Sequence, residues 1–385
     1  MRIALIGSRG IPARYSGFET FYEQLALRLV EKGHDVTVYN RSHFIKDVKK
    51  SYRGVRLVSL PSIPSKHLDT LSHTLISSLH ALFKKYDIVY YCIVGNSPLV
   101  WLPRLLGMKT LLNVDGEDWA RDKWKGFAKT YQLWCERVAG TTANVLIADA
   151  LGIQKRYKER YDRETIFVPY GANITRDEST AQLKTWGLEP NEYILYVGRF
   201  VPENSIDTLV QAYLKLDTRK KLVLVGDAPY VSDYKRHLNA LIGDNPNIIQ
   251  TGYCFGEGYA QLSSHAYVYV QPSGINGTRP ALLDQMGFGN CVLVRDSAVN
   301  MEVISGAGAY FSDDSPVDSL AQRLDSLIHD PALVQEYRDK VRSRIVNYYN
   351  WDRVTDFYED LFGRMVEGAP LISYDQFIGK PSGSR

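Results

Sequence analysis

Short apolar runs alternate with amphipathic segments along the first half of the chain. The first run, Ile3 to Ile6, precedes a glycine-rich turn and a segment from Phe21 to Lys32 whose apolar positions recur at helical spacing. Gly33 follows this predicted helix as a C-cap. Further predicted strands are Asp35 to Tyr39, Val55 to Ser59, Ile88 to Cys92, Thr110 to Val114 and Val145 to Ala148. Strands and helices that alternate at this spacing predict βαβ units around a parallel sheet.

The same pattern starts again at Tyr193 to Val197. The further strands expected here are Lys221 to Val225, Tyr267 to Gln271 and Cys291 to Val294, and the helices are Asp207 to Leu216, Tyr234 to Ile242 and Pro280 to Phe288. Ala321 to Val366 is predicted to be helical, with a break at Asn350. We therefore predict an α/β protein with two doubly wound halves. Ligands of such sheets bind at the carboxyl ends of the strands, so we expect the site in a cleft between the two domains.

Length and composition narrow the class of protein. A chain of 385 residues exceeds what one hydrophobic core usually supports, and 45% hydrophobic with 23% charged residues is ordinary for a soluble protein. A net charge of +3 is too small to indicate a nucleic-acid partner. The four cysteines lie far apart without metal-ligand spacing, which favours reduced thiols and no zinc site. Without a signal-peptide pattern or an apolar run of about 18 residues, we expect a cytoplasmic protein whose last residues, from Gly379, form a tail.

The first predicted strand leads into the loop GSRGIPARYSGFET, which runs from Gly7 to Thr20. Its glycines Gly7, Gly10 and Gly17 do not have the GxGxxG spacing, so the loop does not indicate a dinucleotide site. A glycine-rich loop before a helix presents backbone N–H groups to an anion or a sugar, and Arg14 adds positive charge. The alternative is a long structural turn.

Two loops in the second half are candidates for binding a diphosphate. Arg199 follows a predicted strand directly, and a guanidinium binds phosphate through two hydrogen bonds; the alternative is an ordinary solvated arginine. After the strand that ends at Gln271, Gly277 and Thr278 precede a helix that starts at Pro280, where N–H and hydroxyl groups suit phosphate. Asp284, one turn into that helix, suits ribose hydroxyls. The alternative here is an ordinary capped helix.

These motifs together resemble a known family. GRxxPE from Gly198, GDAP from Gly226, TGY from Thr251 and PSxxxGTxPALLDxMxxG from Pro272 are similar to the donor domain of family 4 retaining glycosyltransferases. The loop from Gly7, the segment NVDG from Asn113 and the segment NWDRV from Asn350 resemble a bacterial rhamnosyltransferase-like branch of that family. The resemblance covers nearly the whole chain, and the motifs occur in order.

The resemblance implies a GT-B fold, in which two Rossmann-like domains face a central cleft. The expected parts are an acceptor-binding domain at 1–172, a nucleotide-sugar donor-binding domain at 173–345, and a helical segment at 346–385 that packs back toward the first domain. The implied activity transfers a hexose, with rhamnose from dTDP-rhamnose favoured, to a glycan or lipid-linked hydroxyl acceptor in cell-surface polysaccharide synthesis. The anomeric configuration is retained, the nucleotide sugar is a co-substrate, and neither a cofactor nor a metal is expected.

The resemblance also implies roles for individual residues. Asp115, Arg199 and Asn276 are the candidates for catalysis, and Glu19 with the Gly7 to Gly17 loop is expected to meet the acceptor or the diphosphate. The expected donor-binding set is Arg199, Asn204, Tyr253, Asn276, Gly277, Thr278, Arg279 and Asp284.

This sequence departs from the family pattern at three places. Asn276 replaces the first of two acidic residues eight positions apart, the second being Asp284; Asn204 replaces a lysine; and Asp115 stands where a histidine is usual. Arg279 is a candidate to replace the missing lysine charge. The loss of the first acid leaves open a non-catalytic sugar-nucleotide-binding subunit. A sugar-nucleotide epimerase is a weaker alternative, because no histidine pair or carboxylate cluster is evident, and an NAD-dependent oxidoreductase is weaker still.

Two basic clusters, Lys46 to Arg56 and Arg121 to Lys129, suggest peripheral contact with the anionic inner face of a membrane. The alternative is that both are ordinary solvated surfaces.

Overall fold

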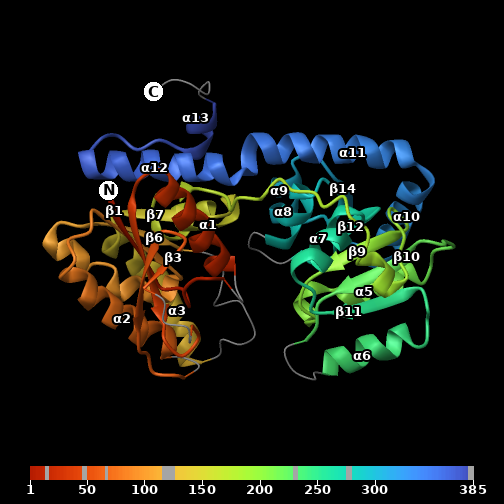
Figure 1. The fold of residues 1–385 in the computed structure, drawn as a ribbon, viewed down its shortest axis with the longest axis horizontal. Coiled ribbons are helices and arrows are strands. Elements are labelled where there is room, and N and C mark those ends of the chain that lie inside the picture. Colours follow the sequence, from red (N-terminus) through yellow and green to blue (C-terminus); the bar gives the residue numbers. More distant parts are fainter. Residues whose placement is uncertain are drawn as a thin grey trace. The chain divides into compact units, whose positions relative to one another are not determined.

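The chain folds into two compact α/β units in a computed structural model, which describes residues 1–13, 17–45, 50–65, 68–114, 126–228, 233–274 and 280–379 (Figure 1). Unit 1 comprises residues 1–171 and 351–385, and unit 2 comprises residues 172–350. Of the helices in these described ranges, none has the length and apolar character needed to cross a membrane.

The sheet of unit 1 has the strand order β3-β4-β2-β1-β5-β6-β7-β8. All neighbouring strands are parallel except β3, which pairs antiparallel with β4. Every residue of β5 is buried, because helices cover both faces of a parallel sheet. The strands are β1 (Arg2–Ile6), β2 (Asp35–Arg41), β3 (Ser51–Tyr52), β4 (Val55–Leu60), β5 (Ile88–Cys92), β6 (Lys109–Asn113), β7 (Val145–Ala148) and β8 (Ile166–Phe167).

The helices of unit 1 come from both ends of the chain: α1 (Gly17–Glu31), α2 (Asp69–Leu82), α3 (Phe127–Thr142), α4 (Leu151–Tyr161), α12 (Trp351–Glu367) and α13 (Tyr374–Ile378). Two 3-10 helices, η1 (Val94–Leu99) and η2 (Pro103–Leu106), connect β5 to β6. α12 packs on α1, where Arg28 Nε lies 2.8 Å from Asp352 Oδ1. α12 also contacts the sheet, because the buried hydroxyls of Tyr358 on α12 and Tyr90 on β5 are 2.9 Å apart.

Unit 2 has an entirely parallel sheet with the order β11-β10-β9-β12-β13-β14. Its strands are β9 (Tyr193–Val197), β10 (Lys221–Val225), β11 (Ile248–Gly252), β12 (Val268–Gln271), β13 (Cys291–Arg295) and β14 (Ala309–Phe311). Its helices are α5 (Ile206–Tyr213), α6 (Asp233–Ile242), α7 (Gly256–Ser264), α8 (Pro280–Gly287), α9 (Ala298–Ile304), α10 (Pro316–His329) and α11 (Pro331–Arg344). A π-helical stretch, Ile345–Tyr349, follows α11.

The α/β class with parallel sheets in two Rossmann-like units is confirmed. Each strand expected from the sequence is present, with ends that agree within two residues. The strands β3, β8, β11 and β14 were not predicted from the sequence. β3 and β8 have two residues each, too few to show a period, and the polar end of β11 (Gln250, Thr251, Gly252) hides its apolar start.

Candidate functional site

Both sheets reverse their strand order at one point. In unit 2, β10 and β11 lie on one side of β9, whereas β12, β13 and β14 lie on the other. In unit 1 the reversal lies between β1 and β5. Ligands of open α/β sheets bind beside the carboxyl ends of the strands at such switch points. Arg199 follows β9, and Gly7 follows β1, so both predicted loops start at a switch point.

Three glycines join the carboxyl ends of β9, β10 and β11. The Gly198 N–H donates to Val225 O (3.0 Å), and the Gly226 N–H donates to Gly252 O (2.9 Å). Gly226 has φ +130°, and a Cβ atom there would collide with the Gly198 carbonyl. Glycine is therefore required at Gly226, where two backbone segments are in direct contact. This contact fixes where the Arg199 loop begins.

The Arg199 loop is held by its backbone while the arginine side chain is exposed. Asn204, which is 9% exposed, donates from Nδ2 to Arg199 O (2.8 Å). The Phe200 N–H donates to Asp227 O (3.0 Å), which ties the loop to the end of β10. Asn204 therefore positions the backbone of Arg199. This contact was not part of the donor-binding role that we expected for Asn204.

An acidic and an aromatic group lie beside the ends of β10 and β11. Lys235 of α6 donates from Nζ to Asp227 Oδ1 (2.5 Å), and this hydrogen bond lowers the pKa of Asp227 below its ordinary value. The Tyr253 hydroxyl donates to Asp227 O (3.3 Å). The Tyr253 ring is stacked with Phe255 at an interplanar angle of 11°, and both rings are exposed. This aromatic pair offers a flat apolar surface at the strand ends.

A hydrogen bond spans the switch point of unit 2. Ser273, after β12, donates from Oγ to Glu203 O (2.7 Å) in the loop after β9. Asn300 of α9 in turn donates from Nδ2 to Ser273 O (2.9 Å). Arg295, the last residue of β13, reaches Ser205 Oγ with Nη1 (3.4 Å). The loops on the two sides of the switch point are therefore tied together by side chains.

Asp284 lies on α8, with Leu282, Leu283 and Met286 buried on the same helix. Asp284 as a whole residue is half-buried, and desolvation of its carboxyl group raises its pKa to about 6. Two of the candidates that precede α8, Gly277 and Thr278, lie outside the described residues. The other site candidates outside the described ranges are Arg14, Asp115, Asn276 and Arg279.

In unit 1, Asn40 at the end of β2 holds the glycine-rich loop. The Ile11 N–H donates to Asn40 Oδ1 (3.1 Å), and Asn40 Nδ2 donates back to Ile11 O (2.8 Å). Gly7 has φ +108° and Gly10 has φ +114°, and a Cβ atom on Gly10 would collide with the Asn40 side chain. At the far end of the described loop, the Ala13 N–H donates to a carboxylate oxygen of Glu23 (2.5 Å).

Arg41, directly after Asn40, contacts the first residue of the same loop. Its side chain is buried, and it donates to Gly7 O (3.0 Å) and to Asp69 Oδ2 (2.7 Å). His73 of α2 lies beside it, with Nε2 3.1 Å from Asn40 O. Burial is the larger cause and the positive charge of Arg41 the smaller one of a shift that lowers the pKa of His73 to about 4. His73 is therefore neutral at pH 7.

Several of these positioning residues were not predicted from the sequence. The pair Asn40 and Arg41 left a signal, because two polar residues follow the apolar Val38 and Tyr39 at the end of β2. Arg295 had a similar signal at the end of β13, whereas nothing local marked Lys235. Of the predicted loop residues, Gly17 begins α1 and Glu19 is buried in its first turn.

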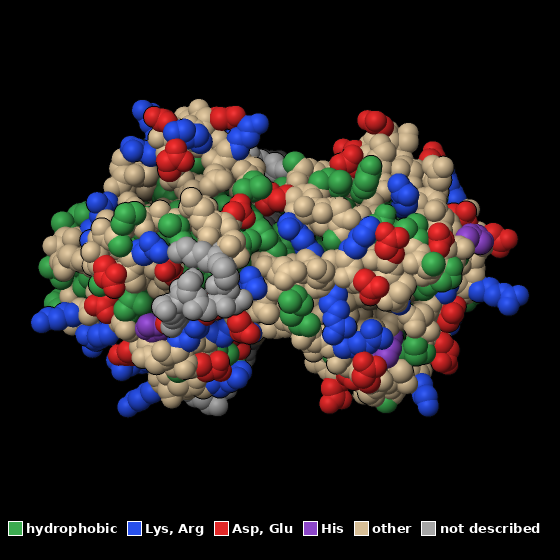
Figure 2. All heavy atoms as spheres, turned by 90° about the horizontal axis from the view of Figure 1, so that it is seen from above, with side chains coloured by type: hydrophobic (Ala, Val, Ile, Leu, Met, Phe, Trp, Pro, Cys, Tyr) green, Lys and Arg blue, Asp and Glu red, His purple; other side chains and the backbone are tan. Residues whose placement is uncertain are grey.

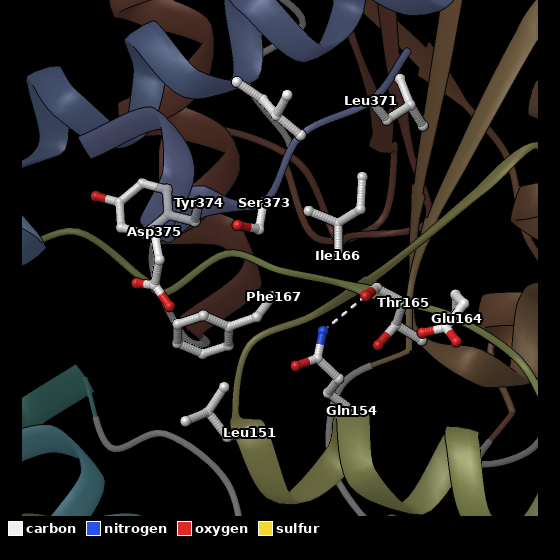
Figure 3. A pocket seen from close by; sticks show the side chains of 11 residues that line it. Leu151, Gln154, Glu164, Thr165, Ile166, Phe167, Leu371, Ser373, Tyr374 and Asp375 are labelled. Atoms are coloured by element: carbon white, nitrogen blue, oxygen red, sulfur yellow. Dashed lines mark hydrogen bonds between the residues drawn. The ribbon is translucent and has the colours of Figure 1, made fainter. Parts of the chain in front are cut away.

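A cavity of about 300 Å³ lies elsewhere in unit 1, between α4, β8 and the segment before α13 (Figure 3). Gln154 and Thr165 both line the cavity, and Gln154 donates from Nε2 to Thr165 O (2.7 Å). The cavity contains no residue of the predicted site. Among the described residues, no three His, Cys, Asp or Glu side chains are grouped so that they could hold a metal ion.

Two protein families match different parts of the chain. Residues 191–330 match the family described as glycosyl transferases group 1, and residues 86–173 match a domain of unknown function, DUF1972. An alpha-maltose-1-phosphate synthase from Mycobacterium tuberculosis is 24% identical over 261 residues. That match covers 60% of this chain and 66% of the mycobacterial protein.

Solved structures with the same fold match almost the whole chain. Sucrose-phosphate synthase from Thermosynechococcus elongatus has a TM-score of 0.79 at 20% identity, covering 96% of this chain and 100% of its own. HepE from Anabaena, in complex with UDP, has a TM-score of 0.76 at 15% identity, covering 94% and 100%. Residues 191–330 therefore match the glycosyl transferases group 1 family, and the chain has the GT-B fold of these structures, which agrees with the prediction of a glycosyltransferase-type enzyme.

Proposed function

We propose that the chain is a retaining glycosyltransferase that moves a hexose from a nucleoside-diphosphate sugar to a hydroxyl of a glycan or lipid-linked acceptor. The observation that carries the proposal is the pair of tied loops at the switch point of unit 2, where Arg199 is exposed on a fixed backbone. These loops lie within the matched glycosyl transferases group 1 region. HepE, which shares the fold, has been crystallised with UDP and with UDP-glucose.

The donor in this proposal is a deoxyhexose nucleotide, with dTDP-rhamnose favoured, and the pathway is cell-surface polysaccharide synthesis. The support is the resemblance of the loop from Gly7 and of the segments at Asn113 and Asn350 to a rhamnosyltransferase-like branch. Work at the cytoplasmic face of a membrane fits a lipid-linked acceptor.

The reaction breaks the bond between the anomeric carbon and the diphosphate oxygen, and it forms a bond from the acceptor oxygen on the same face of the sugar. The acceptor proton passes to the departing diphosphate. Negative charge develops on that diphosphate, so fixed donors that stabilise it lower the barrier. We assign this role to Arg199 and Arg279 with Gly277 and Thr278, and we assign sugar positioning or proton transfer to Asp115.

The remaining candidates bind other parts of the substrates. Asp284 accepts hydrogen bonds from the ribose, and Tyr253 lies against the base. Asn276 contacts sugar hydroxyls as an amide, while the loop from Gly7 and Glu19 meet the acceptor or the diphosphate. We propose no metal for this step, because guanidinium and N–H groups supply the positive charge.

A second candidate is a sugar-nucleotide-binding subunit without turnover. The specific observation in its favour is Asn276, an amide where the family pattern has an acid. Such a protein would bind the nucleotide sugar as tightly as an enzyme does but would release no diphosphate.

The test is a panel of dTDP-, UDP- and GDP-sugars, followed by thermal shift and by release of free nucleoside diphosphate with and without lipid-extract acceptors. The decisive variant is Arg199→Ala. Its matched control is Arg219→Ala, because Arg219 is also exposed but precedes β10, at the opposite edge of the same sheet. One donor should stabilise the protein and turn over, and only Arg199→Ala should abolish both effects. Stabilisation without turnover would favour the second candidate, and no response to any donor would refute both.

A further inference from the structure

Unit 1 concentrates exposed apolar side chains on α2 and on the neighbouring segment of η1 and η2, which pack against each other. Phe83 is 84% exposed, Leu105 is 67% exposed and Leu106 is 61% exposed. Together these residues form a surface that we call the α2–η2 patch, with the members Leu75, Leu79, Phe83, Trp101, Leu105 and Leu106.

The α2 helix has an inverted amphipathic pattern. Leu75, Leu79 and Phe83 are four residues apart, so they form one stripe, and this stripe faces outward. The buried face of the same helix carries small or polar residues, namely His73, Thr74, Ser77, Ser78 and Ala81. A helix on a water-exposed surface normally has the opposite arrangement. The outward stripe therefore indicates contact with an apolar partner.

Most charges in the segment of the chain that carries the patch are positive. Between residues 69 and 114 the basic residues are Lys84, Lys85, Arg104 and Lys109, and the acidic residues are Asp69, which is ion-paired with Arg41, and Asp87. Asp87 accepts a hydrogen bond from the Arg2 backbone N–H (2.7 Å). Lys84 and Lys85 directly follow Phe83, and Arg104 directly precedes Leu105, and all three are exposed. On the face of unit 1 that Figure 2 shows, Lys and Arg side chains lie beside hydrophobic ones.

We propose that the α2–η2 patch docks on a bilayer that contains anionic lipids. Leucine and phenylalanine side chains enter the boundary between headgroups and acyl chains, Trp101 lies at the interface, and the lysines contact lipid phosphates. Lysine is depleted at protein–protein interfaces, which favours a lipid surface over a protein partner. This surface differs from the two basic clusters that the sequence suggested, and it goes beyond glycosyl transfer because vesicle binding needs no sugar nucleotide.

The first test measures sedimentation of the full chain with phosphatidylcholine vesicles, with or without about 30 mol% phosphatidylglycerol. We expect binding to the anionic vesicles. The variant Leu105→Glu/Leu106→Glu should weaken it by at least about tenfold. Lys84→Gln/Lys85→Gln should weaken it roughly fivefold for each lysine. Leu214→Glu, at an exposed leucine of unit 2, is the control and should bind as the wild type does.

A second measurement does not depend on how well the leucine variants fold. Trp101 is 43% exposed, so its emission should shift to the blue on anionic vesicles, and Trp101→Phe should lose that part of the shift. Lys155→Gln, on the exposed side of α4, is the charge control. Absence of binding to anionic vesicles overturns the proposal, and so does binding that the patch variants leave unchanged. If instead the patch variants abolish self-association in sedimentation velocity without affecting vesicles, the partner is a second copy and the bilayer proposal is wrong. Donor turnover measured separately keeps this outcome distinct from failure of the transferase proposal.

Discussion

Asp284 offers the sharpest test of the electrostatics of unit 2. The residue is half-buried on α8, and burial of its carboxyl group raises the pKa from 3.8 to about 6. At pH 7.5 the carboxyl group is ionised in both states, and its ionisation costs more free energy in the native state than in the unfolded chain. Replacing Asp284 with Asn keeps the shape of the side chain and removes that charge.

The size of the effect follows from the shift. The rise in the pKa of Asp284 from 3.8 to about 6 corresponds to about 3 kcal/mol, and partial exposure of the residue to solvent reduces this to about 1–2 kcal/mol. Because the native pKa is the higher one, the native state binds more protons between pH 4 and 6. Asp284 therefore costs stability above pH 6 and costs none below pH 4. Asp284→Asn should stabilise the protein at pH 7.5, and the gain should fade as the pH approaches 4.

The assay is the melting temperature of wild type and Asp284→Asn between pH 4 and 8, with the exposed Asp217→Asn of the same unit as control. Differences between variants are preferable to an absolute free energy, since a chain of two units need not unfold in one step. A lower melting temperature of Asp284→Asn at pH 7.5, or a gain that is the same at every pH, would refute this role of the Asp284 charge.

The same group links donor binding to pH. If the Asp284 carboxylate accepts ribose hydroxyls, binding favours the charged form, so nucleotide affinity should rise as the pH increases from 5 to 7. Calorimetry at pH 6 in two buffers of different ionisation enthalpy should show proton release on binding. Asp284→Asn should lose both effects, whereas proton release that persists in this variant would assign the linkage to another group.

Three further perturbations test the positioning contacts. Asn204→Ala removes the hydrogen bond to Arg199 O, so we expect a loss of about 1 kcal/mol in unfolding free energy and weaker nucleotide binding, measured by denaturation and calorimetry. His73→Gln should flatten the acid side of the stability profile, because a native pKa of about 4 makes the wild type lose up to about 3 kcal/mol as the pH falls from 6.5 to 4. Gly171→Ala places a methyl group against the Trp351 ring and should cost about 1–3 kcal/mol, seen as a lower melting temperature, and unchanged stability would contradict the packing of α12.

The sequence predicted the central strands because each is a continuous apolar run. β1, β9 and β10 are buried on both faces, so their pattern needs no partner to be recognised. It could not predict β3 and β8, whose two residues become strands only when a neighbour supplies hydrogen bonds. Long-range pairing decides these short elements, and local propensity does not.

The residues of the candidate site also fall into those that the sequence predicted and those that only the fold reveals. Gly7 and Arg199 were found because they directly follow apolar strands, and strand ends are where ligands bind. Asn40 was missed because its role depends on β2 lying next to β1, which the sequence does not state. The contact from Ser273 to Glu203 depends on β12 lying next to β9, although 70 positions separate the two residues.

The two units support their loops with similar means. In unit 1, a buried amide and a buried guanidinium, Asn40 and Arg41, hold a glycine loop by its backbone. In unit 2, Asn204 and Ser273 hold the loops beside Arg199 by their carbonyls. Fixing the backbone before the substrate arrives lowers the reorganisation that charge development would otherwise require. The side chains that hold these loops are therefore as much a part of the candidate site as the groups expected to touch the donor, and they are the ones that only the fold reveals.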